Sequence, residues 1–368
     1  MKINDKVLSL TPYKPGKPVD ELTRELGITD IVKLASNENP RGPEDRVRRA
    51  IEAAVPSLSR YPDGNGFRLK KALSERLGVE PGRITLGNGS NDVLNLAAAM
   101  ALGPDTSAVI SEHAFVVYRI GITVNDARLL EAPARDFGAD LDAMLAAVQD
   151  DTAMVFLANP NNPTGTWVDE ASLTRFLDAL PSHVWMVLDE AYFEYVTADG
   201  YPDGVKLLAR YPNLIVTRTF SKIYGLAGLR VGYAVSSAEA ADLMNRVREP
   251  FNVNSLALAG AEAALADDGY LVESRRLNAE GMAEITRGLD ALGIGHIPSA
   301  GNFVTFEVPD GAGAGTPAPG QAVYEALLRE GVIVRPVAEY GLPRHLRVTV
   351  GLADENARFL EALRRVLG

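Results

Sequence analysis

The sequence contains no cysteine and only four histidines among its 368 residues. Without cysteine the chain can form no disulfide, no thiolate nucleophile and no cysteine-ligated metal site, although this leaves the compartment open. The histidines are far apart and show no metal-ligand spacing; they are His113, His183, His296 and His345. We therefore expect no metal cofactor.

Long apolar runs and an excess of positive charge are also missing. The first 22 residues, MKINDKVLSLTPYKPGKPVDEL, lack the apolar core of a signal peptide, and no run approaches the length of a membrane span. The formal net charge is −11, whereas affinity for nucleic acid comes mainly from clustered Lys and Arg. We expect a cytoplasmic protein with neither a membrane nor a nucleic-acid partner.

Short apolar runs in the first part of the chain predict buried parallel strands. They lie at residues 108–110, 154–158, 185–188 and 214–217, and each is apolar on both faces. Between the second and third runs, Asp169 opens a helical pattern that Pro181 closes. This strand–helix–strand alternation predicts an α/β fold with a mostly parallel sheet between helices.

The pattern changes beyond about Pro250. Longer helical stretches at 254–267 and 269–292 precede strand candidates at 303–306 and 346–350, which indicates a smaller α+β domain. A chain of this length exceeds the usual limit for one hydrophobic core, so two domains are expected. The low-complexity segment GAGAGTPAPG at 311–320 predicts a mobile surface loop before a helix at 322–329.

A glycine-rich turn, GNGSND at residues 87–92, follows a strand candidate at 83–86 and precedes a helical pattern. Such a turn offers free backbone N–H groups and the positive end of a helix dipole to an anion. A plain turn with Ser90 or Asn91 as the helix cap explains the pattern equally well. The turn alone therefore leaves a phosphate site and a helix cap as alternatives.

Chemically active side chains follow two of the predicted strands. Asp189 and Tyr192 come after the run at 185–188, at the strand end where open α/β sheets bind ligands, although Asp there is often only a helix cap. Lys222 follows the next run, beside Ser221 and eight residues before Arg230. A lone Lys is usually a solvated surface group, but these apolar and glycine-rich surroundings favour a functional one.

These motifs resemble those of the fold-type-I aminotransferases. NPNNPTG at 159–165, LDEAY at 188–192 and the Ser-Lys pair with its later Arg occur there in this order and spacing. Within that superfamily, KLASNENP at 33–40, RYP at 60–62, the turn at 87–92 and LRVTVG at 346–351 are similar to histidinol-phosphate aminotransferases. The resemblance covers almost the whole chain from about Tyr13.

The resemblance implies three parts of the chain and one cofactor. Residues 1–39 would pack with the small domain, residues 40–250 would form the large cofactor-binding domain, and residues 251–368 would form the small C-terminal domain. The cofactor would be pyridoxal 5'-phosphate, attached to Lys222, which would also serve as general acid–base. Asp189 would keep the pyridine nitrogen protonated.

The remaining cofactor contacts implied by the resemblance surround the ring and its phosphate. Tyr192 and Asn162 would hydrogen-bond the ring oxygen, and Phe115 would stack on the ring. The phosphate would be held by Ser90, Asn91, Ser221 and Arg230. Tyr61 would reach the phosphate of the neighbouring subunit, which implies a homodimer with shared active sites; Phe115 and Tyr61 could instead be core aromatics.

The implied reaction is transamination of L-histidinol phosphate with 2-oxoglutarate, which gives imidazole acetol phosphate and glutamate in histidine biosynthesis. Arg347 and Arg335 match the anion-binding arginines of the family, and a planar guanidinium suits both carboxylate and phosphate. A surface Arg without a ligand is the alternative for Arg335. Further candidates for the substrate pocket are Tyr13, Asn37, Asn162 and Asn254.

Three alternative functions share this scaffold. An aromatic-amino-acid aminotransferase is the nearest, because a pocket that accepts imidazole can also accept phenyl. A phosphothreonine decarboxylase would use the same Lys, Asp and Arg set but release carbon dioxide. A cofactor-binding regulator would usually carry an added helix-turn-helix domain, and the aminotransferase-like sequence begins too early here for us to expect one.

Overall fold

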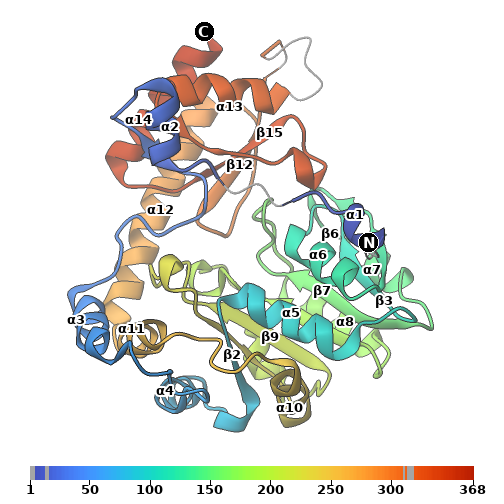
Figure 1. The fold of residues 1–368 in the computed structure, drawn as a ribbon. Helices are drawn as coiled ribbons and strands as arrows, with labels where there is room; N and C mark the ends of the chain where they lie inside the picture. Colours follow the sequence, from blue (N-terminus) through green and yellow to red (C-terminus); the bar gives the residue numbers. More distant parts are fainter. Residues whose placement is uncertain (1–4, 13–15, 310, 313–318) are drawn as a thin grey trace.

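The computed structural model describes residues 5–12, 16–309, 311–312 and 319–368. A seven-stranded sheet forms the centre of the larger part of the molecule (Figure 1). The strand order is β2-β10-β9-β8-β7-β3-β4. In that order the strands span Ile84–Gly87, Gly232–Val235, Leu214–Thr219, Trp185–Asp189, Thr152–Ala158, Ser107–Ser111 and Arg128–Ala132. Strand β10 is antiparallel to both its neighbours and the other pairs are parallel, so the mostly parallel sheet is confirmed.

Helices cover both faces of this sheet because its side chains alternate between two apolar cores. Along β7, Met154 and Phe156 belong to one core, whereas Val155 and Leu157 belong to the other. The first core is closed by α5 (Ser90–Ala101), α6 (Val116–Val124) and α10 (Ala238–Val247). The second is closed by α3 (Asp45–Ala54), α4 (Phe67–Leu77), α7 (Leu141–Ala146), α8 (Glu170–Ala179), α9 (Gly204–Leu207) and α11 (Ser255–Leu265).

A smaller antiparallel sheet has the strand order β11-β12-β15-β14. Its strands span His296–Ile297, Phe303–Glu307, His345–Thr349 and Arg335–Pro336. Helices α13 (Pro319–Arg329) and α14 (Ala353–Leu367) share its apolar core. An N-terminal stretch joins this part of the molecule, because β1 (Val32–Lys33) pairs in parallel with β13 (Val332–Ile333), and Leu22 of α2 (Val19–Leu26) contacts the same region.

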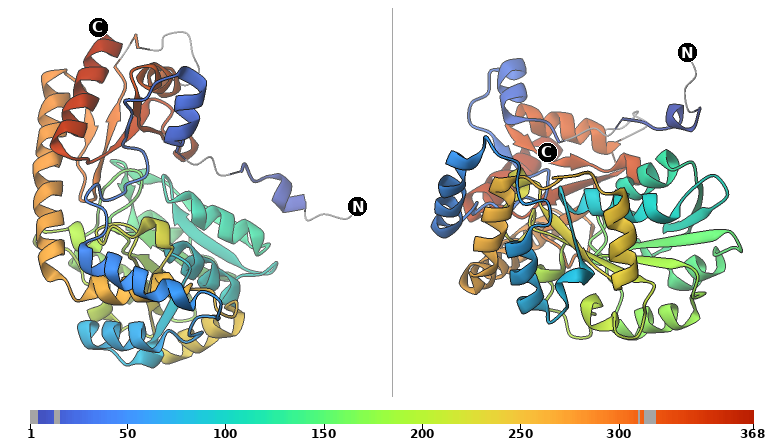
Figure 2. Two further views of the ribbon diagram at one scale, coloured as in Figure 1. Left: turned by 60° about the vertical axis from the view of Figure 1, so that its left-hand side comes forward. Right: turned by 60° about the horizontal axis from the view of Figure 1, so that its bottom comes forward.

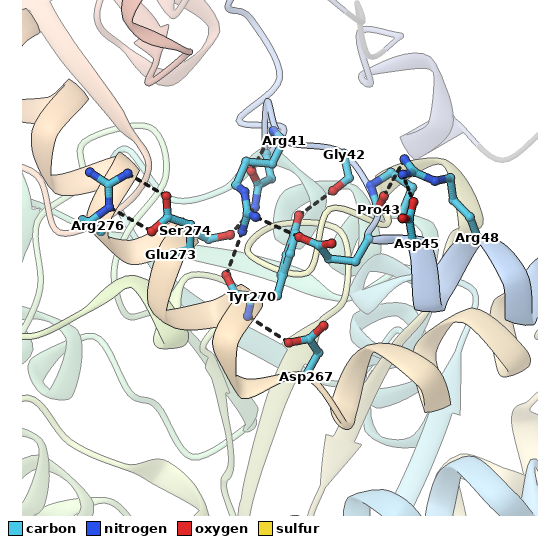
Figure 3. A network of polar contacts seen from close by, with 12 residues as sticks. Arg41, Gly42, Pro43, Asp45, Arg48, Asp267, Tyr270, Glu273, Ser274 and Arg276 are labelled. Atoms are coloured by element: carbon cyan, nitrogen blue, oxygen red, sulfur yellow. Dashed lines mark hydrogen bonds and ion pairs between the residues drawn. The ribbon is translucent and has the colours of Figure 1, made fainter.

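The long helix α12 (Asp268–Ala291) runs along one side of the molecule and extends from the large-sheet part to the small-sheet part (Figure 2). At its beginning, the Tyr270 hydroxyl donates to the Gly42 carbonyl at 2.7 Å, and the Arg41 guanidinium lies 4.5 Å from the Tyr270 ring centroid (Figure 3). Further along, Ile285 and Leu289 enter the core of the small sheet. Helix α12 therefore packs against the large-sheet part at its beginning and against the small sheet further along.

The domain boundary predicted at residue 250 falls before α11, whose Ala257 and Ala261 pack in the large-sheet core. The helices expected at 254–267 and 269–292 are α11 and α12, and the helix expected at 322–329 begins at Pro319. Within the loop expected before it, residues 313–318 lie outside the described part of the chain. The described residues contain no helix long and apolar enough to cross a membrane.

Several short elements complete the chain. They are α1 (Asp5–Leu8), the antiparallel pair β5 (Ala134–Arg135) and β6 (Gly138–Ala139), and the single 3-10 turns Val55–Ser57, Pro81–Arg83, Phe193–Tyr195, Ala227–Leu229 and Ala338–Tyr340. The last two turns matter for the site, because one precedes Arg230 and the other contains Tyr340. Both residues border the cavity described next.

Candidate active site

A cavity lies where the carboxyl ends of β7, β8 and β9 meet the first turn of α5 and the small-sheet strands β14 and β15. This is the edge at which open α/β sheets bind ligands. Most of the side chains predicted from the sequence line it together: Asn37, Ser90, Asn91, Phe115, Asn162, Asp189, Tyr192, Ser221, Lys222, Arg230, Arg335 and Arg347. The fold therefore gathers residues from both sheets around one space.

Lys222 reaches this cavity from the loop after β9. Its Nζ donates to the Ser36 carbonyl at 3.1 Å and lies 5.7 Å from the Tyr192 ring centroid. Burial, the largest cause, and the nearby Arg347 charge together lower the pKa of Lys222 to about 7, and the Glu38 charge opposes them. An amine with such a pKa is about half unprotonated near neutral pH, and the unprotonated form is the one that acts as a nucleophile or general base.

Asp189 ends β8 and is buried at the floor of the cavity. Tyr118 donates from its hydroxyl to Oδ2 at 2.7 Å, and Thr217 donates to Oδ1 at 3.0 Å. Burial raises the pKa of Asp189, and the hydrogen bonds from Tyr118 and Thr217 oppose that rise. The two donors fix the carboxylate in place, where it can pair with a cationic group in the cavity.

The N-terminus of α5 is a candidate anion site. Gly89 precedes the helix with φ 86°, in the left-handed region, and no described side chain caps the helix start. Ser90 and Asn91 of its first turn line the cavity, so the uncapped N–H groups lie beside it. Arg230 Nη1 donates to Ser221 Oγ at 3.3 Å beside these groups. A Cβ on Gly89 would overlap the Arg230 guanidinium, so glycine permits this convergence. This geometry is compatible with the phosphate site predicted for the turn.

Asn37 and Asn162 join the two sheets across the cavity. Asn37 Nδ2 donates to the Tyr192 hydroxyl at 2.8 Å, and the Asn37 backbone N–H donates to Thr349 Oγ1 at 2.9 Å. Asn162 Oδ1 accepts from Arg347 Nη1. These amides hold a phenol and a guanidinium at fixed positions, so neither group has to be ordered when a ligand binds.

Two buried arginines form the small-sheet side of the cavity. Arg347 on β15 and Arg335 on β14 are direct Cα partners in an antiparallel pair. Arg347 Nη2 donates to the Ala35 carbonyl at 2.7 Å, whereas Arg335 Nη2 pairs with Glu339 Oε1 at 2.5 Å. Both guanidinium groups suit carboxylate or phosphate oxygens.

The other predicted residues differ in their placement. Phe115 precedes α6 and lies edge-on to Tyr118, with ring centroids 5.9 Å apart. Tyr61 is 81% exposed and stacks on Phe251 outside the cavity of its own chain. Asn254 also lies outside this cavity, because its side chain caps α11 by accepting from the Ala257 N–H at 2.8 Å. Tyr13 lies outside the described residues, so its role stays a prediction.

Several residues at the site were not predicted, among them Tyr118, Thr217, Tyr340 and Ser36. Tyr118 could have been found one helical turn after Phe115, and Thr217 by aligning the carboxyl ends of neighbouring strands, because it is the Cα partner of Asp189. Tyr340 carries no local motif, and Ser36 acts through its backbone carbonyl, which no side-chain pattern reveals. Their roles come from contacts between distant parts of the chain.

Comparison with known proteins identifies the family. The family model described as "Aminotransferase class I and II" matches residues 29–363. The chain belongs to the class I and II aminotransferases. The expected fold-type-I architecture is confirmed by solved structures of this kind, and the cavity is the candidate active site of an aminotransferase.

Several relatives of this aminotransferase share its full length. Histidinol-phosphate aminotransferase 2 of Pseudomonas aeruginosa is 58% identical over 363 residues, which are 98% of this chain and 96% of that protein. Histidinol-phosphate aminotransferase 1 of Nitrosococcus oceani is 55% identical over 361 residues, 98% and 95% of the two chains. A crystal structure of histidinol-phosphate aminotransferase from Sinorhizobium meliloti in complex with pyridoxal-5'-phosphate superposes with a TM-score of 0.89 and 32% identity, and the match covers 100% and 97% of the chains.

The cavity of this aminotransferase fits pyridoxal phosphate. The cofactor requires an amine for its aldehyde, a carboxylate for its ring nitrogen and donors for its phosphate. Lys222 supplies an amine of low pKa, and Asp189 supplies a buried, hydrogen-bonded carboxylate. The close approach of Arg230 to Gly89 supplies an anion cradle at the same cavity. The residues present therefore match the family's cofactor.

Proposed function

We propose that this aminotransferase transfers the amino group of L-histidinol phosphate to 2-oxoglutarate, giving imidazole acetol phosphate and glutamate in histidine biosynthesis. The observation that carries the proposal is a single cavity with Lys222 and Asp189 on one side and Arg335 and Arg347 on the other. Full-length identities of 58% and 55% to proteins named histidinol-phosphate aminotransferase support the substrate. A cytoplasmic location is part of the proposal.

The proposed cofactor is pyridoxal 5'-phosphate, which supplies an aldehyde that exchanges amines and a protonated ring that withdraws electrons from the amino-bearing carbon. Lys222 would hold it covalently, and Ser90, Asn91, Ser221 and Arg230 would hold its phosphate. Asp189 would pair with the ring nitrogen and favour its cationic form, because an opposite charge nearby stabilises a protonated base.

Three further side chains would hold the ring. Tyr192 and Asn162 would contact the ring oxygen, and Asn37 orients the Tyr192 hydroxyl through its 2.8 Å hydrogen bond. Phe115 would lie against the ring face, and the edge-on contact with Tyr118 limits its rotation. Ring and phosphate would thus be bound by groups that the fold has already ordered.

Lys222 would also move the proton during transfer. Its pKa of about 7 leaves Nζ able to accept a proton from the amino-bearing carbon of the substrate near neutral pH. The Ser36 carbonyl, 3.1 Å from Nζ, offers the amine a resting position at the edge of the cavity. The same side chain thus serves as covalent anchor and general acid–base.

Arg335 and Arg347 would bind both substrates in turn. L-Histidinol phosphate has a phosphate and no α-carboxylate, whereas glutamate has two carboxylates. Guanidinium groups accept either anion through paired N–H donors. Arg347 is already oriented by Asn162 Oδ1 and the Ala35 carbonyl, which favours one fixed receptor for the α-carboxylate of glutamate.

We further propose a homodimer in which Tyr61 reaches the cofactor phosphate of the neighbouring subunit. Tyr61 is 81% exposed and stacks on Phe251 at 4.7 Å, and Leu58 and Phe67 nearby in sequence are also exposed. Tyr61 and Phe251 thus form an exposed stacked aromatic pair, and aromatic side chains are enriched at protein interfaces. Sedimentation of the cofactor-loaded protein tests this assembly.

The visible absorption spectrum of the cofactor-loaded protein tests the reaction. Separate additions of histidinol phosphate, phenylalanine and glutamate should each convert the cofactor to its amino form, histidinol phosphate at the lowest concentration. More effective conversion by phenylalanine would favour an aromatic-amino-acid aminotransferase. Release of carbon dioxide from phosphothreonine would favour the decarboxylase, and failure of the cofactor to attach would contradict the assignment of Lys222.

A further inference from the structure

Glu339 lies next to the active-site cavity, four residues after Arg335. Its Oε1 pairs with Arg335 Nη2 at 2.5 Å. The Arg335 side chain is 7% exposed and lines the active-site cavity, whereas the Glu339 side chain is 33% exposed and lines an adjacent cavity. Tyr340 lines both cavities. The ion pair therefore stands at their boundary, beside an anion-binding arginine but in reach of solvent.

The two arginines of the cavity differ in the contacts that the described residues give them. Arg335 and Arg347 are direct cross-strand partners, an arrangement in which like charges oppose each other. Arg347 donates to neutral acceptors, Asn162 Oδ1 and the Ala35 carbonyl. Arg335 instead contacts a carboxylate, so Glu339 brings a full negative charge to the place where a substrate anion would bind.

We infer that Glu339 sets the relative affinity of this site for phosphate-bearing and carboxylate-bearing substrates by holding a negative charge beside Arg335. The inference rests on the proposed function, in which one site must accept both classes in turn. A phosphate ester carries nearly two negative charges near neutral pH, and the side-chain carboxylate of glutamate carries one. Because Coulomb energy is proportional to charge, a fixed carboxylate opposes the phosphate twice as strongly.

The expected effect follows from this proportionality. A unit charge about 5 Å away, screened as in water, weakens binding about fourfold for a monoanion and about sixteenfold for a dianion. Glu339 thereby lowers the ratio of the two binding affinities, phosphate-bearing to carboxylate-bearing substrate, by about fourfold. The carboxylate-bearing substrate can then compete for the site. Because Arg335 is buried, removal of its partner lowers the stability of the protein, so the thermal unfolding of Glu339→Gln is compared with that of the wild type to confirm that the variant is folded.

Glu339→Gln tests the inference, because it removes the charge and keeps the size of the side chain. We would titrate the cofactor-loaded protein calorimetrically with phenyl phosphate and with benzoate, which share a ring and differ in charge, at about pH 8 to keep the phosphate dianionic. The variant should bind phenyl phosphate about sixteenfold more tightly and benzoate about fourfold more tightly. Glu339→Asp retains the charge and should restore both wild-type affinities.

Glu280→Gln is the matched control, because Glu280 forms the same i,i+4 type of pair with Arg276 on an exposed face of α12. It should change neither affinity. Equal tightening of both ligands by Glu339→Gln, or no tightening, would overturn the inference. These binding data do not depend on turnover. Unequal tightening in a protein that fails to convert histidinol phosphate would support the role of Glu339 and overturn the proposed substrate.

Discussion

Replacement of Lys222 by methionine should stabilise the cofactor-free protein near neutral pH. The fold lowers the pKa of Lys222 from its ordinary value of 10.5 to about 7, because burial and the neighbouring Arg347 charge disfavour the ammonium form. The native protein therefore binds this proton less tightly than the unfolded chain does. That difference is free energy of folding that the wild-type protein gives up for a reactive amine.

The magnitude follows from the two pKa values. They differ by about 3.5, and at about 1.4 kcal/mol per pH unit this corresponds to about 5 kcal/mol. Water in the cavity reduces the figure, and methionine loses the hydrogen bond to the Ser36 carbonyl, worth about 1 kcal/mol. We therefore expect a gain of about 2–4 kcal/mol in the free energy of unfolding.

The gain should depend on pH in a defined direction. Below a pH of about 7 both states of the wild type hold the proton, so the full penalty applies. Between about 7 and 10.5 only the unfolded chain binds it, so wild-type stability rises with pH and the advantage of the variant shrinks. Above 10.5 the advantage disappears.

Calorimetric unfolding of the cofactor-free proteins across this pH range measures the effect. Lys71→Met is the control, because the Lys71 side chain is 64% exposed on α4 and should give no pH-dependent gain. A Lys222→Met protein no more stable than wild type below pH 7, or one whose advantage persists at high pH, would refute the reasoning.

Three substitutions test the other parts of the site. Asp189→Asn removes the carboxylate held by Tyr118 and Thr217, so kcat should fall by about a hundredfold or more, and an unchanged kcat would exclude its role at the ring nitrogen. Arg347→Ala should raise the KM for glutamate about tenfold or more and raise the pKa of Lys222, which its charge lowers; an unaltered KM would remove it from the substrate site. Gly89→Ala places a methyl group against the Arg230 guanidinium at a residue with φ 86°. The affinity for the cofactor, measured by equilibrium dialysis, should therefore fall about tenfold or more. An undiminished affinity would contradict the role of this turn in binding the phosphate.

Local patterns in the sequence determined much of the architecture. Runs apolar on both faces become the central strands because each face of the sheet packs against helices, as Met154 and Val155 do on opposite sides. Asp169 begins a helix because its carboxylate accepts from the Ser172 N–H. Motif order and spacing placed Lys222 in the site, because these motifs follow successive strands whose carboxyl ends meet at one edge.

Only the tertiary structure decided how these residues act together. A sequence motif identifies Asp189, but Tyr118, which donates a hydrogen bond to its carboxylate, lies 71 residues away on another element. The low pKa of Lys222 depends on enclosure by the fold and on Arg347, which the small sheet brings to the cavity. Asn254 matches a pocket residue in sequence, yet its side chain caps a helix in this chain. Burial, charge pairing and competition for hydrogen bonds are set by contacts between distant segments, which local sequence does not encode.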